Sequence, residues 1–331
     1  MLHITNGDIA AARIDAAGIG GRVLPWRDVL HEGPVPAALT PAALREQRAR
    51  FIASRNWGPF DAVLRDMEAR DAALVDAGAF TEIVLWFEHD LYDQLQLLQI
   101  LGMLAVLRPG GAAMSLINID RFPGVREFTG LGQLSPEALR TLFPARAPLT
   151  VQQLALGKRA WDAFGGPDPD AIEAVLEDDL SSLPFLRPAL IRHLEQFPDV
   201  AAGINRSERQ ILQVLAEGSR TVAETFRADQ RLEDAVFMGD ASFCWLLHSI
   251  GRGSSRLIDM EGGDVAEPSS AAIPEFFQRR VAITDTGREV LHGHADRTAL
   301  LGLDRWLGGV HLTSPDIAWR WDANAQRLTE G

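Results

Sequence analysis

Two short runs near the start of the chain concentrate residue types that carry out acid–base and metal chemistry. The runs are Trp26-Arg27-Asp28-Val29-Leu30-His31-Glu32-Gly33-Pro34 and Trp86-Phe87-Glu88-His89-Asp90-Leu91-Tyr92-Asp93-Gln94. A carboxylate beside an imidazole can place a general acid and a general base within hydrogen-bond reach, and the same residue types bind divalent metals. The residues expected to be catalytic are His31, Glu32, Glu88 and His89, and a divalent metal is an alternative use of the same side chains.

Both runs follow apolar stretches that are typical of strands, and a third polar group follows another such stretch at residues 2–6. Polar groups that recur just beyond strands indicate a ligand crevice at the carboxyl edge of a parallel sheet. The residues expected to bind the ligand are Asn6, Gly7, Asp8, Arg27, Asp28, Asp90 and Gln94. We expect Asp8, His31, Glu32, Glu88 and His89 to converge around one cavity.

Several of these residues also have a structural interpretation. Asp8 stands where a helix N-cap is expected, and Asp90 or Asp93 can cap the helix that follows them. Arg27 offers a planar fork for a carboxylate or phosphate, or else it pairs with an acid while His31 bonds a backbone carbonyl. Asp8 disfavours a bare phosphate at its helix terminus and suits a sugar hydroxyl, an amine or a metal.

The elements that must position these residues alternate between strands and helices. Strands are predicted at 2–6, 22–25, 83–87 and 113–117, with helices at 9–17, 40–55, 59–77 and 90–107. Alternation of this kind is typical of an α/β unit with a parallel sheet.

No strand is predicted between residue 135 and the C-terminal region. Helices are predicted from 135, at 151–164, 168–180, 184–196, 208–216, 221–227 and 240–250, followed by strands at 256–260 and 280–284, a loop at 261–275 and a helix from 286. Three helices followed by a hairpin are the elements of a winged-helix module. The predicted modules are an α/β domain at 1–130 with the ligand site, a helical connecting region at 131–200, and a winged-helix-like domain at 201–331. A terminal β-hairpin is expected around Trp306, Trp319 and Trp321.

Composition narrows the classes of protein that the chain can belong to. Its 331 residues, 47% of them hydrophobic, suffice for two domains with their own cores. No apolar run approaches the roughly 18 residues of a membrane span, and no leader pattern opens the chain, so a cytoplasmic location is expected.

The single cysteine, Cys244, lies among apolar residues and is expected to pack without reacting. The single lysine, Lys158, is not part of a phosphate-binding loop motif.

Three motifs in this order resemble a bacterial domain-of-unknown-function family catalogued under the number 1835. They are Leu2-His3-Ile4-Thr5-Asn6-Gly7-Asp8, the run from Trp26 to Pro34, and Glu88-His89-Asp90-Leu91-Tyr92-Asp93-Gln94-Leu95. Two further stretches, 304–312 and 319–322, resemble the C-terminal region that accompanies it. The resemblance implies a motif set and module boundaries, and it implies no reaction.

We expect an enzyme that performs acid–base or metal-assisted hydrolysis or transfer on a small polar substrate, nucleotide-like or phosphorylated. Arg27 would be the anion clamp, and His31 or His89 the base. The alternatives are a ligand-sensing regulator that uses the winged-helix-like module, and an interaction scaffold whose motif residues pair with one another. DNA binding is not expected, because residues 240–250 contain no Arg or Lys and the net charge is −13. Internal packing or a homodimer interface is the expected use of that module.

Overall fold

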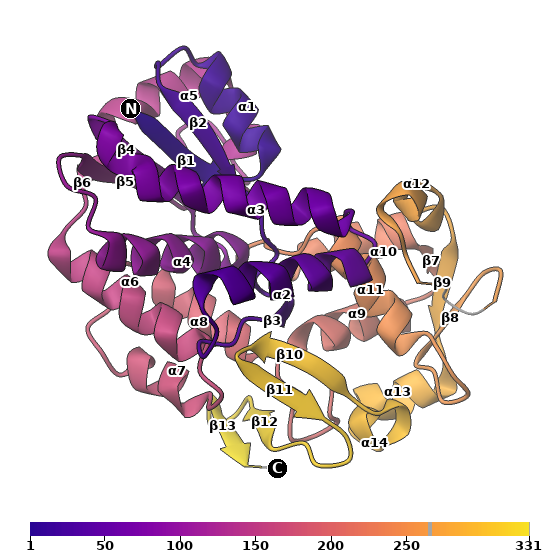
Figure 1. Ribbon diagram of the computed structural model, residues 1–331. Coiled ribbons are helices and arrows are strands. Elements are labelled where there is room, and N and C mark those ends of the chain that lie inside the picture. Colours follow the sequence, from indigo (N-terminus) through magenta and orange to yellow (C-terminus); the bar gives the residue numbers. More distant parts are fainter. Residues whose placement is uncertain (264–266, 331) are drawn as a thin grey trace. The chain divides into compact units, whose positions relative to one another are not determined.

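The computed structural model describes residues 1–263 and 267–330 and has the predicted mixed α/β class (Figure 1). The chain forms two compact units, each assembled from three separate segments. Unit 1 contains Met1–His31, Ala37–Arg45 and Leu64–Leu190, and unit 2 contains Glu32–Pro36, Glu46–Val63 and Ile191–Gly331. Such interleaved units do not test the module boundaries expected near residues 130 and 200, which stay predictions.

Unit 1 contains a five-stranded sheet in the order β2-β1-β4-β5-β6. The strands are β1 (Leu2–Asn6), β2 (Arg22–Trp26), β4 (Glu82–Glu88), β5 (Ala113–Ile119) and β6 (Ala147–Pro148). The first four are the predicted strands and are parallel, whereas β6 pairs antiparallel with β5. Sequence analysis missed β6 because a two-residue strand has no periodicity to detect.

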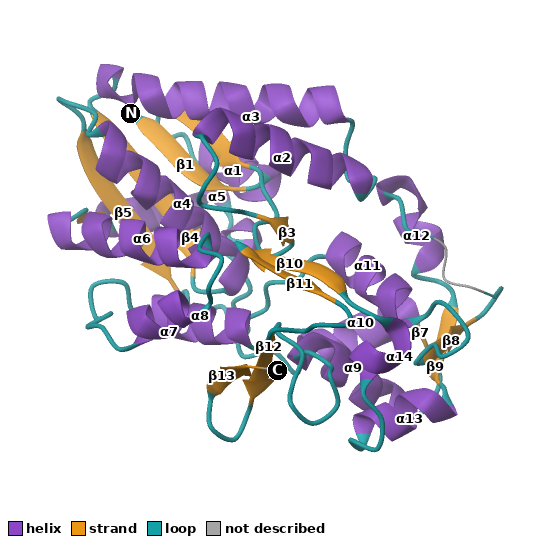
Figure 2. Cartoon of the chain, turned by 60° about the horizontal axis from the view of Figure 1, so that its bottom comes forward, coloured by secondary structure: helices purple, strands orange, loops and turns teal. Residues whose placement is uncertain are grey.

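Unit 1 also contains helices that lie wholly or mostly within it. They are α1 (Asp8–Ala16), α3 (Phe60–Val75), α4 (Leu91–Leu107), α5 (Pro136–Leu142), α6 (Val151–Phe164), α7 (Asp170–Leu176) and α8 (Leu186–Leu194), with short 3-10 turns at Asp76–Ala79, Leu131–Gln133 and Phe143–Ala145. Ile14 of α1 and Leu139 of α5 pack on one face with Trp86. Helix α4 lies beside α6 (Figure 2) and is apolar over most of its surface, as a buried helix must be.

The order of the parallel strands reverses at β1. The chain leaves β1 for β2 on one side, and β4 lies on the other side of β1. Connections that diverge in this way leave a crevice outside the carboxyl ends of the two strands, which is where α/β proteins bind ligands. Asn6 ends β1 and Glu88 ends β4, so both stand at this crevice.

The first segment of unit 2, Glu32–Pro36, contains the last residues of the second motif. Gly33 and Pro34 form β3 (Gly33–Pro34), which pairs parallel with β10 (Asp304–Gly308), and β10 pairs antiparallel with β11 (Val310–Thr313). A Cβ at Gly33 would lie 2.5 Å from the Phe51 ring, and φ is +77° there, so this position requires glycine. Part of the second motif therefore has a structural role that the sequence did not reveal.

The remainder of unit 2 contains helices and a small antiparallel sheet in the order β7-β9-β8. Its elements are α9 (Arg206–Ala216), β7 (Arg220–Thr221), α10 (Val222–Gln230), α11 (Asp240–Ile250), β8 (Ile258–Met260), α12 (Ile273–Phe276) after a 3-10 turn at Ser270–Ala272, β9 (Arg280–Ile283), α13 (Asp285–Leu291) and α14 (Arg297–Leu301). The predicted helices and strands are present in order, and the structure adds β7, α12 and α14. Helix α12 occupies part of the predicted loop, of which residues 264–266 lie outside the described residues. The assignment to the winged-helix class stays a prediction.

The three C-terminal tryptophans belong to two hairpins, so the prediction of one shared hairpin is wrong. Trp306 lies on β10 and stacks on His311 with ring centroids 4.3 Å apart. Trp319 and Trp321 lie on β12 (Trp319–Asp322), which pairs with β13 (Arg327–Glu330). Cys244 is buried and unoxidised, and burial raises the pKa of its thiol to about 12, as the packing prediction requires.

Helix α2 (Pro41–Ser54) is shared between the two units, as are α3 and α8. Among the described residues, no helix has the length and apolar character that a bilayer crossing demands.

Candidate functional site

A cavity of about 460 Å³ opens in unit 1 at the crevice between β1 and β4. Three segments line it: Asn6, Gly7, Asp8, Ile9 and Ala10 after β1; Glu88 and Tyr92 around the end of β4; and Thr129, Gly130, Gly132 and Gln133 from the loop before α5. Four of the predicted site residues, Asn6, Gly7, Asp8 and Glu88, therefore share one cavity, as the carboxyl-edge argument predicts.

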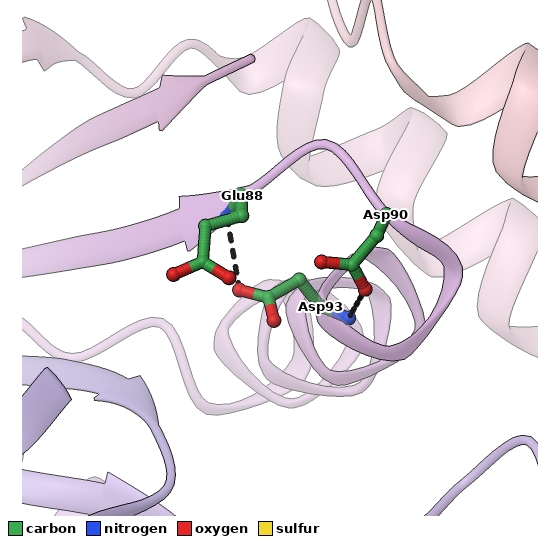
Figure 3. A group of neighbouring side chains, drawn as sticks. All are labelled: Glu88, Asp90 and Asp93. Atoms are coloured by element: carbon green, nitrogen blue, oxygen red, sulfur yellow. Dashed lines mark hydrogen bonds between the residues drawn. The ribbon is translucent and has the colours of Figure 1, made fainter. Parts of the chain in front are cut away.

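Glu88 belongs to a group of three buried acids at the junction of β4 and α4 (Figure 3). One oxygen from each of Glu88, Asp90 and Asp93 lies within 4.8 Å of the others. The Glu88 N–H donates to Asp93 Oδ1 at 2.9 Å, and the Asp93 N–H donates to Asp90 Oδ1 at 3.1 Å. Asp90 is thus the N-cap of α4, which confirms that one of the two aspartates caps this helix.

Asn6 and Leu131 complete the surroundings of the Glu88 carboxyl group. The Asn6 side-chain amide donates to Glu88 Oε2 at 3.2 Å and also to Asp93 Oδ2, while the Leu131 N–H donates to Glu88 Oε1. A Cβ at Gly130 would lie 2.8 Å from Glu88 Oε2, so this position accepts only glycine while Glu88 keeps its place. The loop before α5 is therefore fitted to Glu88.

The electrostatics of the cluster favour a proton on Glu88. Burial raises the pKa of Glu88 well above its ordinary value, and the negative charges of Asp93 and Asp90 raise it further. Burial also raises the pKa of Asp93, to about 6, although hydrogen bonds from the Glu88 N–H, Asn6 and the Glu88 carboxyl oppose this rise. Burial and the charge of Asp93 also raise the pKa of Asp90, so the three acids titrate as a coupled group in which a retained proton is favoured.

The three acids match a hard divalent cation in ligand type but fit one poorly in their hydrogen bonding. Five of their six carboxylate oxygens already accept a hydrogen bond, from the backbone N–H of Glu88, Asp93 and Leu131 or from Asn6. A cation would have to compete with these donors. Raised pKa values and N–H dipoles both reduce the negative charge that a cation would meet, so no step is assigned to a metal here.

Asp8 does not cap α1, and that expectation is wrong. The N-cap is Gly7, which makes no side-chain capping bond, and Asp8 is the first residue of the helix. Its carboxylate is held by Arg27, whose Nε and Nη2 lie 3.0 and 2.5 Å from Oδ1, and Arg27 also lies 3.4 Å from Asp66. The hydrogen bond from Arg27 lowers the pKa of Asp8. Because Arg27 is engaged with two acids and is not among the lining residues, it is poorly placed to clamp an anion in the cavity.

The two histidines of the motifs are not among the lining residues that the structure describes. His31 is buried, with its ring 5.9 Å from that of Tyr92 in a T-shaped contact. His89 is half-buried between Phe128 and Phe185, at ring distances of 6.4 and 6.0 Å. Its Nδ1 is buried without a hydrogen-bond partner, and burial lowers the pKa of the ring. His31 is thus buried and His89 half-buried against aromatic rings, and the backbone-carbonyl bond expected for a structural His31 stays a prediction.

The remaining predicted residues, Gln94, Asp28 and Glu32, do not line the cavity. Gln94 donates to the Glu88 carbonyl at 2.6 Å, and Asp28 is buried and accepts from the Val29 N–H at 2.8 Å. Glu32 belongs to unit 2, where its carboxylate lies 3.5 Å from Arg305. The second motif therefore contributes mainly to folding, because its acids and Arg27 are already paired or buried.

Sequence analysis did not select two parts of the lining. Tyr92, the only tyrosine of the chain, lies in the third motif, but no role is predicted for it from the sequence. The Thr129–Gly130 segment had no local signal at all, since its role depends on Glu88, which lies 43 positions before Leu131. Only a long-range contact could identify this segment.

Neither the models of known protein families nor the curated proteins with which the chain was compared contain a match to it. The resemblance drawn from the three motifs therefore stays a prediction.

Proposed function

We propose that unit 1 is an acid–base enzyme, a hydrolase or transferase, whose Glu88 carboxyl gives and takes the proton of the reaction. The observation that carries this proposal is the position of Glu88. It is a buried acid with a raised pKa, and it lines a cavity at the point where the strand order reverses. Acids with raised pKa values in such crevices are typical of general acid–base catalysts, because they can donate a proton near neutral pH.

The substrate class follows from the groups around Glu88. The first N–H groups of α1 have no side-chain cap, and the residues that carry them line the cavity, so they are suited to accept an anionic or hydroxyl oxygen. Asp8 would repel an anion, but Arg27 balances its charge. The volume of about 460 Å³ is within the range of small-molecule sites. These features support a small polar substrate that is nucleotide-like or phosphorylated.

The roles expected for His31 and His89 are not part of this proposal, since neither residue is among the lining residues. In their place, Asp93 is the acid–base partner of Glu88. Asp93 accepts a hydrogen bond from the Glu88 carboxyl group, which thereby retains its proton. Asn6 is a positioning residue, because it bridges the two carboxyl groups.

The scaffold alternative has one observation in its favour, because Asp90, Asp93 and Gln94 are paired with other residues of the cluster and buried. It predicts that replacement of Glu88 changes only stability. A cytoplasmic location and a homodimer stay predictions that this cavity does not address.

The proposal is tested by a thermal-shift screen of nucleosides, nucleotides and sugar phosphates on the full chain, followed by NMR detection of product from each stabilising compound. A compound at 100 times its Kd stabilises the fold by about 2.7 kcal/mol. We expect Glu88→Gln to keep binding within a few fold and to lower turnover by about 10²-fold or more. Glu68→Gln, at an exposed glutamate of α3, is the matched control and should behave as wild type. Turnover that survives Glu88→Gln, or a panel with no ligand and no turnover, would contradict the proposal.

A further inference from the structure

Unit 2 has a cavity of its own, of about 330 Å³, in which positive side chains predominate. Its charged lining residues are four arginines and three acids: Arg55, Arg252, Arg297, Arg305, Glu32, Glu208 and Asp304. Trp245, His248, Ser249 and Ser314 add aromatic and polar surface. None of these residues belongs to unit 1, so this cavity is distinct from the one that contains Glu88.

Two of the arginines are matched by acids within the cavity wall. Arg297 is buried, with Nε 3.2 Å from Glu208 Oε1, and it also donates to the Gly302 carbonyl at 2.6 Å. Arg305 lies 3.5 Å from Glu32 and 3.3 Å from the side-chain oxygen of Gln196. Their charges are therefore balanced without a ligand.

The other two arginines, Arg55 and Arg252, make no ion pair with any acid in residues 1–263 and 267–330. Arg55 lies over the Trp245 ring at 4.2 Å. Burial lowers the pKa of Arg55, the negative charges of Glu32 and Glu267 oppose this shift, and the positive charges of Arg305 and Arg252 add to it. Two acids thus act on Arg55 at longer range, but neither Arg55 nor Arg252 has a direct ion-pair partner in the part of the chain that the structure describes.

The remaining acid of the lining does not compensate for these charges. The Asp304 side chain is 82% exposed, and its carboxylate lies 2.8 Å from His311 Nε2. Water screens an exposed carboxylate, so its effect on the half-buried Arg55 is small. An anion from solution would contact the Arg55 and Arg252 guanidinium groups directly, which no acid of the described residues does.

We propose that this cavity binds a phosphate group of a small molecule through Arg55 and Arg252, with Arg305 as a third contact. A carboxylate carries one charge and two acceptor oxygens, whereas a phosphate monoester carries about −1.5 to −2 and three acceptor oxygens near neutral pH. A phosphate offers an oxygen to each of three guanidinium groups, which a single carboxylate cannot do, and the planar arginine fork suits its oxygens. The sequence predicted an anion clamp at Arg27, and this site uses other arginines in the other unit.

The test is calorimetric titration of the full chain with pyrophosphate, inorganic phosphate and citrate at low and moderate salt. We expect pyrophosphate to bind one site and to bind more tightly than citrate. The variant Arg252→Gln removes an exposed side chain that supports no packing, so the fold should survive while pyrophosphate affinity falls by at least about tenfold. Arg231→Gln, at an exposed arginine of unit 2 outside the cavity, is the matched control and should leave the affinity unchanged.

Three results would overturn the proposal: no saturable pyrophosphate binding, equal loss of affinity in Arg231→Gln and Arg252→Gln, or tighter binding of citrate than of pyrophosphate. The two cavities are separated by a further variant. If Glu88→Gln abolishes pyrophosphate binding and Arg252→Gln does not, the anion belongs to the cavity of unit 1 and the proposal fails.

Discussion

The backbone N–H of Glu88 donates a 2.9 Å hydrogen bond to Asp93 Oδ1, so the end of β4 and the first turn of α4 are joined through the carboxylate of Asp93. This bond places two acids side by side in a buried position, which is costly if both are ionised. Their joint titration makes the stability of the protein depend on pH in a definite direction.

The variant Asp93→Asn tests that direction. Because the pKa of Asp93 is about 6 in the folded chain and about 4 in the unfolded chain, the folded state binds more protons between these values, and stability falls as pH rises from about 4 to about 6. The wild type should lose on the order of 1 to 3 kcal/mol over this window that Asp93→Asn does not lose. Urea denaturation across pH gives the difference, and identical pH profiles would contradict the coupling.

Gly130→Ala tests the fit between the loop before α5 and Glu88. The added Cβ would lie 2.8 Å from Glu88 Oε2, so the variant should lose about 1–3 kcal/mol from overpacking in addition to the cost of its positive φ. Gly124→Ala is the control, because φ is +84° there and no atom lies within 4 Å of the added Cβ. Equal melting temperatures for the two variants would show that Glu88 is not held against this loop.

His89→Leu tests whether this histidine is structural. Burial lowers the pKa of His89, so below about pH 6.5 the unfolded chain binds a proton that the folded chain resists, and stability falls as pH falls. His89→Leu should remove that acid-side loss of stability and leave any ligand response unchanged. His292→Leu, at an exposed histidine, is the control. Loss of ligand response in His89→Leu would restore the catalytic role first expected for His89.

The full chain should not bind duplex DNA. Helix α11, the third helix of the winged-helix order, contains no Arg or Lys, and its Trp245 donates to the Arg55 carbonyl at 3.0 Å, so other parts of unit 2 contact it. Tight duplex binding needs several cationic contacts to phosphates and weakens steeply with salt. Fluorescence anisotropy should therefore detect no such binding, and sub-micromolar, strongly salt-dependent affinity would support the regulator alternative.

Local patterns were sufficient to predict the parallel strands and the crevice. Strands β1, β2, β4 and β5 are short apolar runs bounded by turn residues, and the polar groups after β1 and β4 do meet at one cavity. The cap at Asp90 was also predictable, since it depends only on neighbouring residues. Each of these features depends on residues that are close together in the sequence, and periodicity and capping act over such short distances.

The features that could not be predicted depend on contacts between residues far apart in the sequence. The Asp8 carboxylate pairs with Arg27 and therefore does not cap its helix. Strand β3 pairs with a strand about 270 positions later, as the register of Gly33 with Leu307 shows. Glu88 lines the cavity and His89 does not, because adjacent residues at the end of a strand point to opposite sides and only one of them can face the cavity. No local pattern distinguishes these outcomes.

The central claim is that Glu88 keeps a proton in the cavity near neutral pH. Carboxyl ¹³C NMR of the full chain, with Glu88 assigned by comparison with Glu88→Gln, measures this directly across a pH titration. The account predicts that Glu88 titrates well above the ordinary glutamate value of about 4.3 and that Asp93→Asn moves its pKa downward. A Glu88 carboxyl that titrates near 4.3 in the wild type and does not respond to Asp93→Asn would contradict it.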